Sequence, residues 1–158
     1  MEIREVQATD NAALAGIIRW AFEEHDAPRT GSVYSDASTD NLFDLFQAEG
    51  SRLLVGIDGG EIAGCCGIYP TEGLPDGCVE LVKFYLRHES RGKGLGRRLL
   101  EECISLAGKL GYREMYIESF PEFGAAVGMY ELQGFHRLDH PMGQSGHTSC
   151  TIWMLRSL

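Results

Sequence analysis

The sequence has 158 residues, 44% of them hydrophobic, which is enough for one domain with a substantial core (1–158) and too little for two. A net charge of −9 argues against a protein that spreads basic charge over a whole face to bind nucleic acid. No apolar run approaches the length of a membrane span, and the acidic N-terminus is untypical of a signal peptide. We therefore expect a cytoplasmic protein with neither a nucleic-acid nor a membrane partner.

The first half of the chain predicts a strand, a helix, a loop and then a series of strands. Hydrophobic residues recur at helical spacing after a capping Thr9 or Asp10, and Asp58-Gly59-Gly60 is typical of a hairpin turn. The predicted elements are a strand over 2–6, a helix to about residue 24, a loop over 25–39, a short helix over 40–47, strands over 52–57 and 61–69, a loop over 70–77 and a strand over 79–86.

The second half alternates helices and strands. A helix over 95–110 has apolar residues on one face and ends before Gly111. After it we expect a strand over 113–118, a helix over 123–133 and closing strands over 135–138 and 149–155. Hairpin strands followed by a β-α-β-α-β order predict an α/β fold in which helices cover both faces of one mixed sheet.

The five cysteines stand at positions 65, 66, 78, 103 and 150, an odd number. None is arranged as C-x-x-C, and no His and Cys residues have the spacing of a zinc site. We expect them to be small buried hydrophobic residues in a reducing compartment.

The most informative motif is the run Arg91-Gly92-Lys93-Gly94-Leu95-Gly96-Arg97-Arg98, between a predicted strand and a predicted helix. Its glycines let a ligand approach the backbone N–H groups closely. These groups converge at a helix N-terminus, where the helix dipole and the unpaired donors favour an anion. Together with the four cations, the motif predicts a cradle for a pyrophosphate.

The spacing of the glycines argues against two other phosphate-binding loops. A nucleoside-triphosphate loop has Ser or Thr after Gly-Lys, whereas Gly94 follows here. A dinucleotide-binding loop is G-x-G-x-x-G, whereas glycines at 92, 94 and 96 give G-x-G-x-G. A flexible solvated turn is the remaining alternative, but a turn does not need four cations on an acidic chain.

Charge is unevenly distributed along the chain. Residues 1–80 hold 15 acids and 4 bases, a balance of −11, whereas residues 81–158 hold 8 acids and 10 bases, a balance of +2. One local cationic patch suits a compact anionic ligand. The acidic half suits a cationic second substrate, and equally suits a surface that only keeps the protein soluble.

Two motifs resemble those of the GNAT superfamily of acyl-CoA-dependent N-acyltransferases. The loop of that family has Arg or Gln, two residues, Gly, one residue and then Gly or Ala, which Arg91, Gly94 and Gly96 match. Its C-terminal signature is a Tyr four residues before Gly-Phe, which Tyr130 and Gly134-Phe135 match. The resemblance covers nearly the whole chain and implies the GNAT fold, with a mixed, mostly antiparallel sheet of about six or seven strands.

The resemblance implies acetyl-CoA as the cosubstrate and no metal. It places the backbone of Phe84, Tyr85 and Leu86 along the pantetheine arm. The positions that it assigns to the pyrophosphate loop are Arg91, Gly92, Lys93, Gly94, Leu95, Gly96 and Arg97. Phe123 departs from the family pattern, because many members carry an Asn there that contacts the cofactor arm.

The family's chemistry is direct attack of an amine on the thioester. Tyr130 matches the usual general acid, since a phenol can protonate the leaving thiolate; a tyrosine with a purely structural hydroxyl is the alternative. Glu80 matches the position of a base in some members and equally suits a solvent-facing carboxylate. Glu118 and Glu122 are weaker candidates, and histidines 88, 140 and 147 are expected in surface loops.

No motif identifies the acceptor amine. We expect it between the loop 25–39, the strand around Glu80 and the loop 141–149, with Tyr34 and Glu122 as further contacts. Small-molecule and peptide amines, cationic ones among them, remain open, as does a homodimer. The alternative function is a non-catalytic acyl-CoA-binding or sensor module, because a fold does not fix a function.

Overall fold

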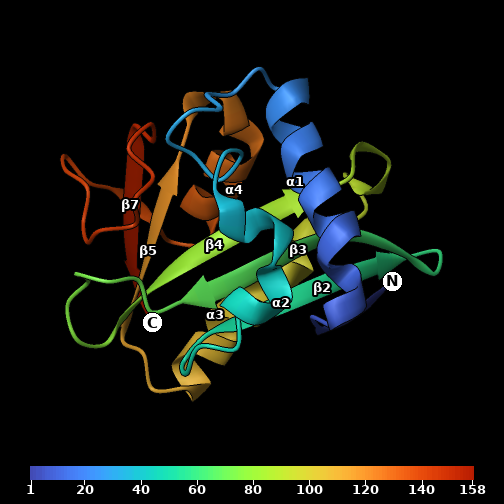
Figure 1. Cartoon of the computed structure of the whole chain (residues 1–158). Helices are drawn as coiled ribbons and strands as arrows, with labels where there is room; N and C mark the ends of the chain where they lie inside the picture. The colour runs from blue at the N-terminus through green and yellow to red at the C-terminus, as the bar shows by residue number, and fades with distance from the viewer.

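The computed structural model describes residues 1–158, which form one seven-stranded sheet (Figure 1). The strands are β1 (Glu2–Glu5), β2 (Arg52–Asp58), β3 (Glu61–Tyr69), β4 (Cys78–Leu86), β5 (Glu114–Ser119), β6 (His136–Arg137) and β7 (Ile152–Ser157). Their order across the sheet is β1-β2-β3-β4-β5-β7-β6. Every neighbouring pair is antiparallel except β4 and β5, so the predicted mixed, mostly antiparallel sheet is confirmed.

Helices cover both faces of the sheet, as predicted. The α-helices are α1 (Asn11–Glu24), α2 (Leu42–Leu45), α3 (Leu95–Lys109) and α4 (Gly124–Leu132), and short 3-10 turns span Ala8–Asp10, Ala37–Asp40, His88–Ser90 and Pro121–Phe123. In Figure 1, α1 and α2 lie in front of the sheet and α3 lies behind it. None of the helices combines the length and the apolar character needed to cross a lipid bilayer.

Two predicted elements have bounds that differ from the structure by more than one residue. The helix expected over 40–47 is only the four-residue α2, and Asp40 belongs instead to an earlier 3-10 turn, which the Asp36 carboxylate caps by accepting from the Ser38 N–H at 2.9 Å. The last strand begins at Ile152 rather than at 149, because Ser149 donates its N–H to the Gly31 carbonyl at 3.2 Å and so belongs to a loop.

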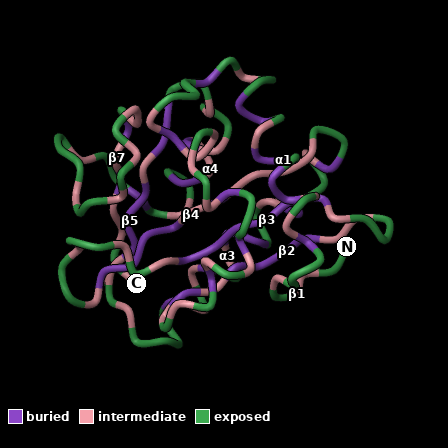
Figure 2. The backbone as a smooth tube through the Cα atoms, viewed as in Figure 1, coloured by how far each residue is buried: buried purple, intermediate pink, exposed green.

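Alternating side chains build one core on each face of the sheet. Leu54 and Cys66 pack toward α3 and α4, whereas their neighbours Leu53 and Cys65 pack toward α1 and α2. Figure 2 shows buried backbone running through the strands and exposed backbone in the connecting loops. The central strands are therefore apolar on both sides, whereas the edge strands β1 and β6 hold exposed residues.

The parallel pair β4–β5 is short. Cys78, Val79 and Glu80 pair with Glu114, Met115 and Tyr116, and no pairing follows. Beyond Glu80 the two strands diverge, as Figure 1 shows. The second half of β4 therefore bonds to β3 on one side and has an open edge on the other.

A β-bulge interrupts β4 in the same region. Between Cys65 and Gly67 the pairing of β3 with β4 shifts by one residue, so β4 holds one residue more than β3. Lys83 takes up this extra residue with a φ of +57°, in the left-handed region. The Cys65 thiol donates to the Lys83 carbonyl at 3.1 Å and so satisfies the bulged backbone.

The bulge reverses the alternation of the side chains that follow it. Phe84 and Leu86 pack toward the core under α3 and α4, and Tyr85 packs toward the core under α1 and α2. Without the extra residue each of the three would point to the opposite face.

Candidate functional site

Two adjoining cavities open where β4 and β5 separate. The narrower cavity, of about 60 Å³, lies between the two strands, and the wider one, of about 360 Å³, lies between the end of β4, the loop before α3, and α4. Four side chains line both: Phe84, Tyr85, Phe123 and Ala126. A single extended ligand can therefore occupy the wider cavity and reach into the narrower one.

The loop before α3 offers unpaired backbone donors to the wider cavity. Gly92 and Gly94 have φ values of +73° and +88°, which only glycine adopts without strain. The first hydrogen bond of α3 runs from the Arg98 N–H to the Gly94 carbonyl at 3.1 Å, so the N–H groups from Gly92 to Arg97 make no hydrogen bond within the protein. Such a helix N-terminus attracts an anion.

Gly96 lines the same cavity, but its lack of a side chain serves packing. A Cβ at this position would lie 3.0 Å from Leu86 Cδ1 and 3.4 Å from Phe84 Cζ. Glycine therefore lets α3 begin close to the end of β4. The neighbouring Leu95 is fully buried in the core and lines neither cavity.

The cations of the loop are paired with carboxylates. The pairs are Arg91–Glu24 at 2.8 Å, Lys93–Asp58 at 2.9 Å and Arg97–Glu101 at 2.7 Å. Arg91 and Arg97 line the wider cavity, whereas Lys93 does not. The positive charge of this region is therefore smaller than the sequence alone indicates.

Tyr130 projects from α4 to the narrower cavity and is 5% exposed. Its ring packs against Phe84 and Phe135, with ring centroids 5.9 Å apart in both pairs. The Tyr130 hydroxyl makes no hydrogen bond within the protein. Since every side-chain N or O atom that is fully enclosed does have a hydrogen-bond partner, this hydroxyl is not fully enclosed, and it opens to the cavity that Tyr130 lines. Burial raises the pKa of Tyr130 well above its usual value and keeps the phenol protonated.

Glu80, on β4, lines the same cavity and is 4% exposed, so it is not a solvent-facing carboxylate. The Thr71 hydroxyl donates to Glu80 Oε1 at 2.8 Å. Burial raises the pKa of Glu80, the Glu118 carboxylate raises it further, and Thr71 and Lys83 oppose the rise, which leaves the pKa at about 7. Glu80 therefore gains and loses a proton near neutral pH.

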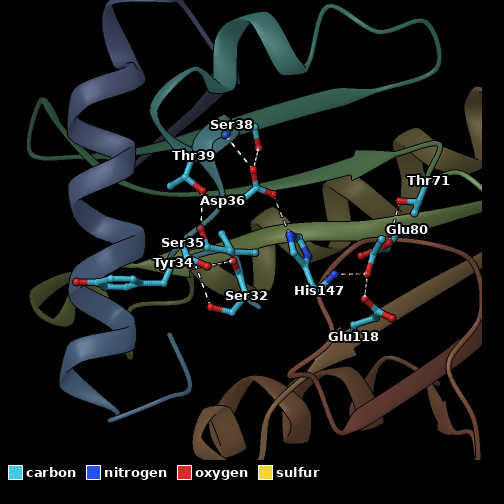
Figure 3. A network of polar contacts seen from close by, with 12 residues as sticks. Ser32, Tyr34, Ser35, Asp36, Ser38, Thr39, Thr71, Glu80, Glu118 and His147 are labelled. Carbon is cyan, nitrogen blue, oxygen red and sulfur yellow. Dashed lines mark hydrogen bonds and ion pairs between the residues drawn. The ribbon is translucent and has the colours of Figure 1, made fainter. Parts of the chain in front are cut away.

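A polar wall closes the narrower cavity, where loops from the two ends of the chain meet (Figure 3). His147 Nε2 lies 3.0 Å from Asp36 Oδ2. The His147 N–H donates to Ser145 Oγ at 3.1 Å, and the Ser145 hydroxyl donates to Glu118 on β5. This chain of contacts ties both loops to the strand opposite Glu80.

Asp36 and His147, two residues of this wall, are held by their contact with each other. Burial acts to raise the pKa of Asp36, but hydrogen bonds from His147 and Ser38 hold it down at about 2. His147 was expected in a surface loop, yet its side chain is only 15% exposed and lines the narrower cavity. The contact with the Asp36 carboxylate holds the imidazole against the protein.

Two sequence-predicted acceptor contacts lie outside both cavities. The Tyr34 hydroxyl donates to Glu23 at 2.8 Å, and Figure 3 shows the ring turned toward α1 and away from Glu80. Glu122 is exposed in the turn before α4. The structure therefore does not bring either side chain to Tyr130 and Glu80, and their binding roles stay predictions.

Lys83 is the buried charged residue of the narrower cavity that sequence reasoning did not single out. It is 6% exposed and lies beside Glu80 in the lining. A lysine in a strand ordinarily indicates a solvent face, and the only sequence signal is that it interrupts an apolar run. No group of three or more His, Cys, Asp or Glu side chains gathers as a metal site.

A sequence profile described as the acetyltransferase (GNAT) family matches residues 14–135. The chain belongs to the GNAT acetyltransferase family. A relative in Escherichia coli K12, the uncharacterized N-acetyltransferase YjgM, is 31% identical over 157 residues, which cover 99% of this chain and 94% of the relative. The predicted family and the predicted enzyme class, an N-acetyltransferase, are confirmed.

Solved GNAT structures share the fold. An acetyltransferase from Staphylococcus aureus Mu50 has a TM-score of 0.85 at 18% identity, covering 99% of this chain and 98% of the other. The protein yncA from Salmonella typhimurium, solved with its cofactor acetyl-CoA, has a TM-score of 0.76 at 24% identity, covering 99% and 93%. At these identities the likeness concerns the fold.

We expect Glu80→Gln to stabilise the protein, relative to the wild type, increasingly as pH rises from about 4.5 to about 7. The pKa of Glu80 is raised in the folded state, so protonated Glu80 contributes stability that is fully present below the unfolded pKa and is lost as pH rises through the folded one. Glutamine stays neutral throughout.

Melting temperatures of both proteins between about pH 4.5 and pH 8.5 check this. Exposed Glu122→Gln is the control, and its curve should run parallel to that of the wild type. A parallel curve for Glu80→Gln would contradict the raised pKa.

Proposed function

We propose that the protein transfers an acetyl group from acetyl-CoA to a primary amine by direct attack, with Tyr130 as general acid and Glu80 as general base. The observation that carries the proposal is that an unpaired phenol and a carboxyl group with a pKa of about 7 face the same narrow cavity. This cavity adjoins one with free helix N-terminal amides.

The residues present suit acetyl-CoA. The open edge of β4 after Glu80 offers backbone groups to an amide-containing arm, in the way that an extended peptide adds to a sheet edge. The free N–H groups from Gly92 to Arg97 suit a pyrophosphate. Phe123 lines both cavities and supplies an apolar wall where many family members have an amide side chain.

Acetyl-CoA supplies the acyl group as a thioester, whose C–S bond breaks as the amine nitrogen forms its bond to the carbonyl carbon. Glu80 accepts the proton that the incoming ammonium group must lose to become a nucleophile. Tyr130 donates its phenolic proton to the departing thiolate sulfur. Attack by the neutral amine leaves a positive charge on the nitrogen, which must lose a second proton to give the neutral amide. The nitrogen therefore gives up two protons in all: one equivalent leaves on the CoA thiol and one is released to solvent, which restores the Glu80 carboxylate and the Tyr130 phenol by proton exchange.

The acidic surroundings favour an acceptor that arrives as a cation. Glu80 and Glu118 line the cavity, and Asp36 lies next to it through His147. These carboxylates attract an ammonium group to the point where a base can deprotonate it.

We expect Gly94→Val to raise the KM for acetyl-CoA. A residue with a Cβ is strained at a φ of +88°, by about 1–2 kcal/mol, and this strain distorts the loop. The same free energy corresponds to a loss of roughly 5- to 30-fold in affinity for acetyl-CoA. The control is Gly108→Ala on α3, where φ is ordinary and nothing lies within 4 Å of the added Cβ. Thiol release at varied acetyl-CoA gives the KM, and an unchanged value in the Gly94 variant would place the cofactor elsewhere.

We expect Tyr130→Phe to lower kcat by roughly 10²- to 10⁴-fold, the usual loss for a general acid, with the KM for acetyl-CoA retained. The readout is thiol release from acetyl-CoA with a panel of amines. Tyr112→Phe is the control, since it removes a hydroxyl that donates to the Gly50 carbonyl outside both cavities. Full turnover in Tyr130→Phe would mean that the Tyr130 hydroxyl is only structural. No turnover of the wild-type protein with any amine would favour the alternative function, a non-catalytic binding module.

We expect kcat/KM for the amine, expressed per concentration of neutral amine at saturating acetyl-CoA, to rise with pH through an inflection near pH 7, the pKa of Glu80. The reason is that a general base acts in its deprotonated form, and kcat/KM reports the enzyme before the amine binds. Glu80→Gln should lower kcat/KM and remove this inflection. The pH–rate profiles of the two proteins check the assignment. An inflection that persists in Glu80→Gln would belong to another group.

A further inference from the structure

The bulge in β4 places an ammonium group inside the narrower cavity. Lys83 is 6% exposed, and its backbone is fixed in the left-handed region with the carbonyl bonded to the Cys65 thiol. Among the cavities described here, it lines only the narrower one. Its position is therefore built by the fold and is not that of a freely moving surface lysine.

The Lys83 ammonium has no partner in the protein. Nζ makes no hydrogen bond, and no carboxylate oxygen lies within 4.0 Å of it. Because every fully enclosed side-chain N or O atom is hydrogen-bonded, an unpaired Nζ keeps some accessible surface, and the narrower cavity is the one described here that Lys83 lines. A buried cation without an anion in contact is costly, so this site favours a ligand that supplies one.

The nearest carboxylates are already committed to other donors. Asp36 accepts from His147 and Ser38, and Glu80 accepts from Thr71. Burial lowers the pKa of Lys83, and Asp36 and Glu80 oppose this by favouring the charged form. These two carboxylates thus hold the charge at a distance without pairing with it.

We propose that Lys83 binds an anionic oxygen group of the acceptor, so that the acceptor is an amine that also carries a carboxylate or a comparable oxyanion, as an amino acid does. This rests on the proposed function. Glu80 and Lys83 lie three residues apart on β4 and line the same cavity as Tyr130. The amine of such an acceptor lies at Glu80 while its anion lies at Lys83.

This assignment restricts the expected cationic acceptors to amines that also carry an acid group. A polyamine carries further ammonium groups, one of which would have to approach the buried ammonium of Lys83. An amino acid is attracted to the acidic surroundings by its amine and to Lys83 by its acid group. The pairing of charges within one small ligand matches the two signs of charge in the cavity.

A purely electrostatic role for Lys83 is the rival explanation, since its charge lowers the pKa of Glu80. Loss of that effect would shift the pH–rate profile equally for every acceptor. Recognition of an anion instead changes the ratio between acidic acceptors and their uncharged analogues. This ratio is therefore the deciding quantity.

The experiment measures thiol release at saturating acetyl-CoA with matched amines. The probes are α-amino acids and their carboxamides, and β-alanine beside 2-aminoethylphosphonate and propylamine. Each rate is expressed per concentration of neutral amine, because removing the acid group changes the amine pKa. We expect kcat/KM for the best acidic acceptor to exceed that of its uncharged analogue by roughly 10- to 150-fold, the range for a hydrogen bond to a charged group. Comparing kcat/KM for 2-aminoethylphosphonate with that for β-alanine shows whether the site prefers a carboxylate or another oxyanion.

In Lys83→Met we expect the ratio to fall to near 1, whereas Lys109→Met, at the exposed end of α3, should keep the wild-type ratio. If Lys83→Met does not fold, Lys83→Gln takes its place. The ratio between acidic and uncharged acceptors in the wild-type protein is a test that requires no variant. Equal kcat/KM for acidic and uncharged amines, or an unchanged ratio in Lys83→Met, would overturn the role of Lys83 while the acetyltransferase proposal stands. No amine-dependent thiol release at all would overturn both.

Discussion

The early end of the β4–β5 pairing is the constraint on which the site depends. Two parallel strands that bond over only three residues cannot stay at ladder spacing beyond Glu80. Their divergence opens the narrower cavity and leaves one edge of β4 without a strand partner. On their other sides the two strands pair with β3 and β7, so the gap lies inside a continuous sheet. Side chains from β4, β5, α4 and two loops then reach it from different directions.

The bulge at Lys83 decides which side chains meet in that gap. It reverses the alternation of β4, so Phe84 and Leu86 support Tyr130 and the start of α3, while Tyr85 supports α1. The same single residue brings an ammonium group into the cavity that Glu80 lines, whose carboxyl group has a pKa of about 7. Backbone strain of a non-glycine residue at positive φ costs about 1–2 kcal/mol and persists only where the surroundings over-determine it.

Local patterns were sufficient to predict the elements and the two motif positions. Gly92 and Gly94 adopt the conformations that a phosphate-type loop needs, and Tyr130 lies at the end of α4 as its spacing before Gly-Phe indicates. These features are determined by residues that are close together in the sequence. The order of hydrophobic segments likewise predicted the mixed sheet with helices on both faces.

What the sequence did not reveal depends on contacts between distant residues. The pKa of Glu80 is raised by burial and by Glu118, against the opposing hydrogen bond from Thr71. The position of His147 depends on its contact with Asp36, more than a hundred positions away. Lys83 looks like an exposed strand residue until the register of β3 against β4 is known. Both faces of β4 are apolar, so its side-chain pattern does not show where the alternation reverses, and neither the bulge nor the charge that it buries was predicted.

The contact between Asp36 and His147 has a consequence for how such proteins diverge. The strand edge and the helix N-terminus on one side of the gap come from one continuous stretch, whereas the polar wall on the other side comes from loops at the two ends of the chain. Mutations in these loops can reshape the wall and leave the continuous stretch untouched. Under the proposed function, evolution can therefore change which side groups of an acceptor fit against the wall, while the continuous stretch keeps the acyl-donor site, Glu80 and Lys83 in place.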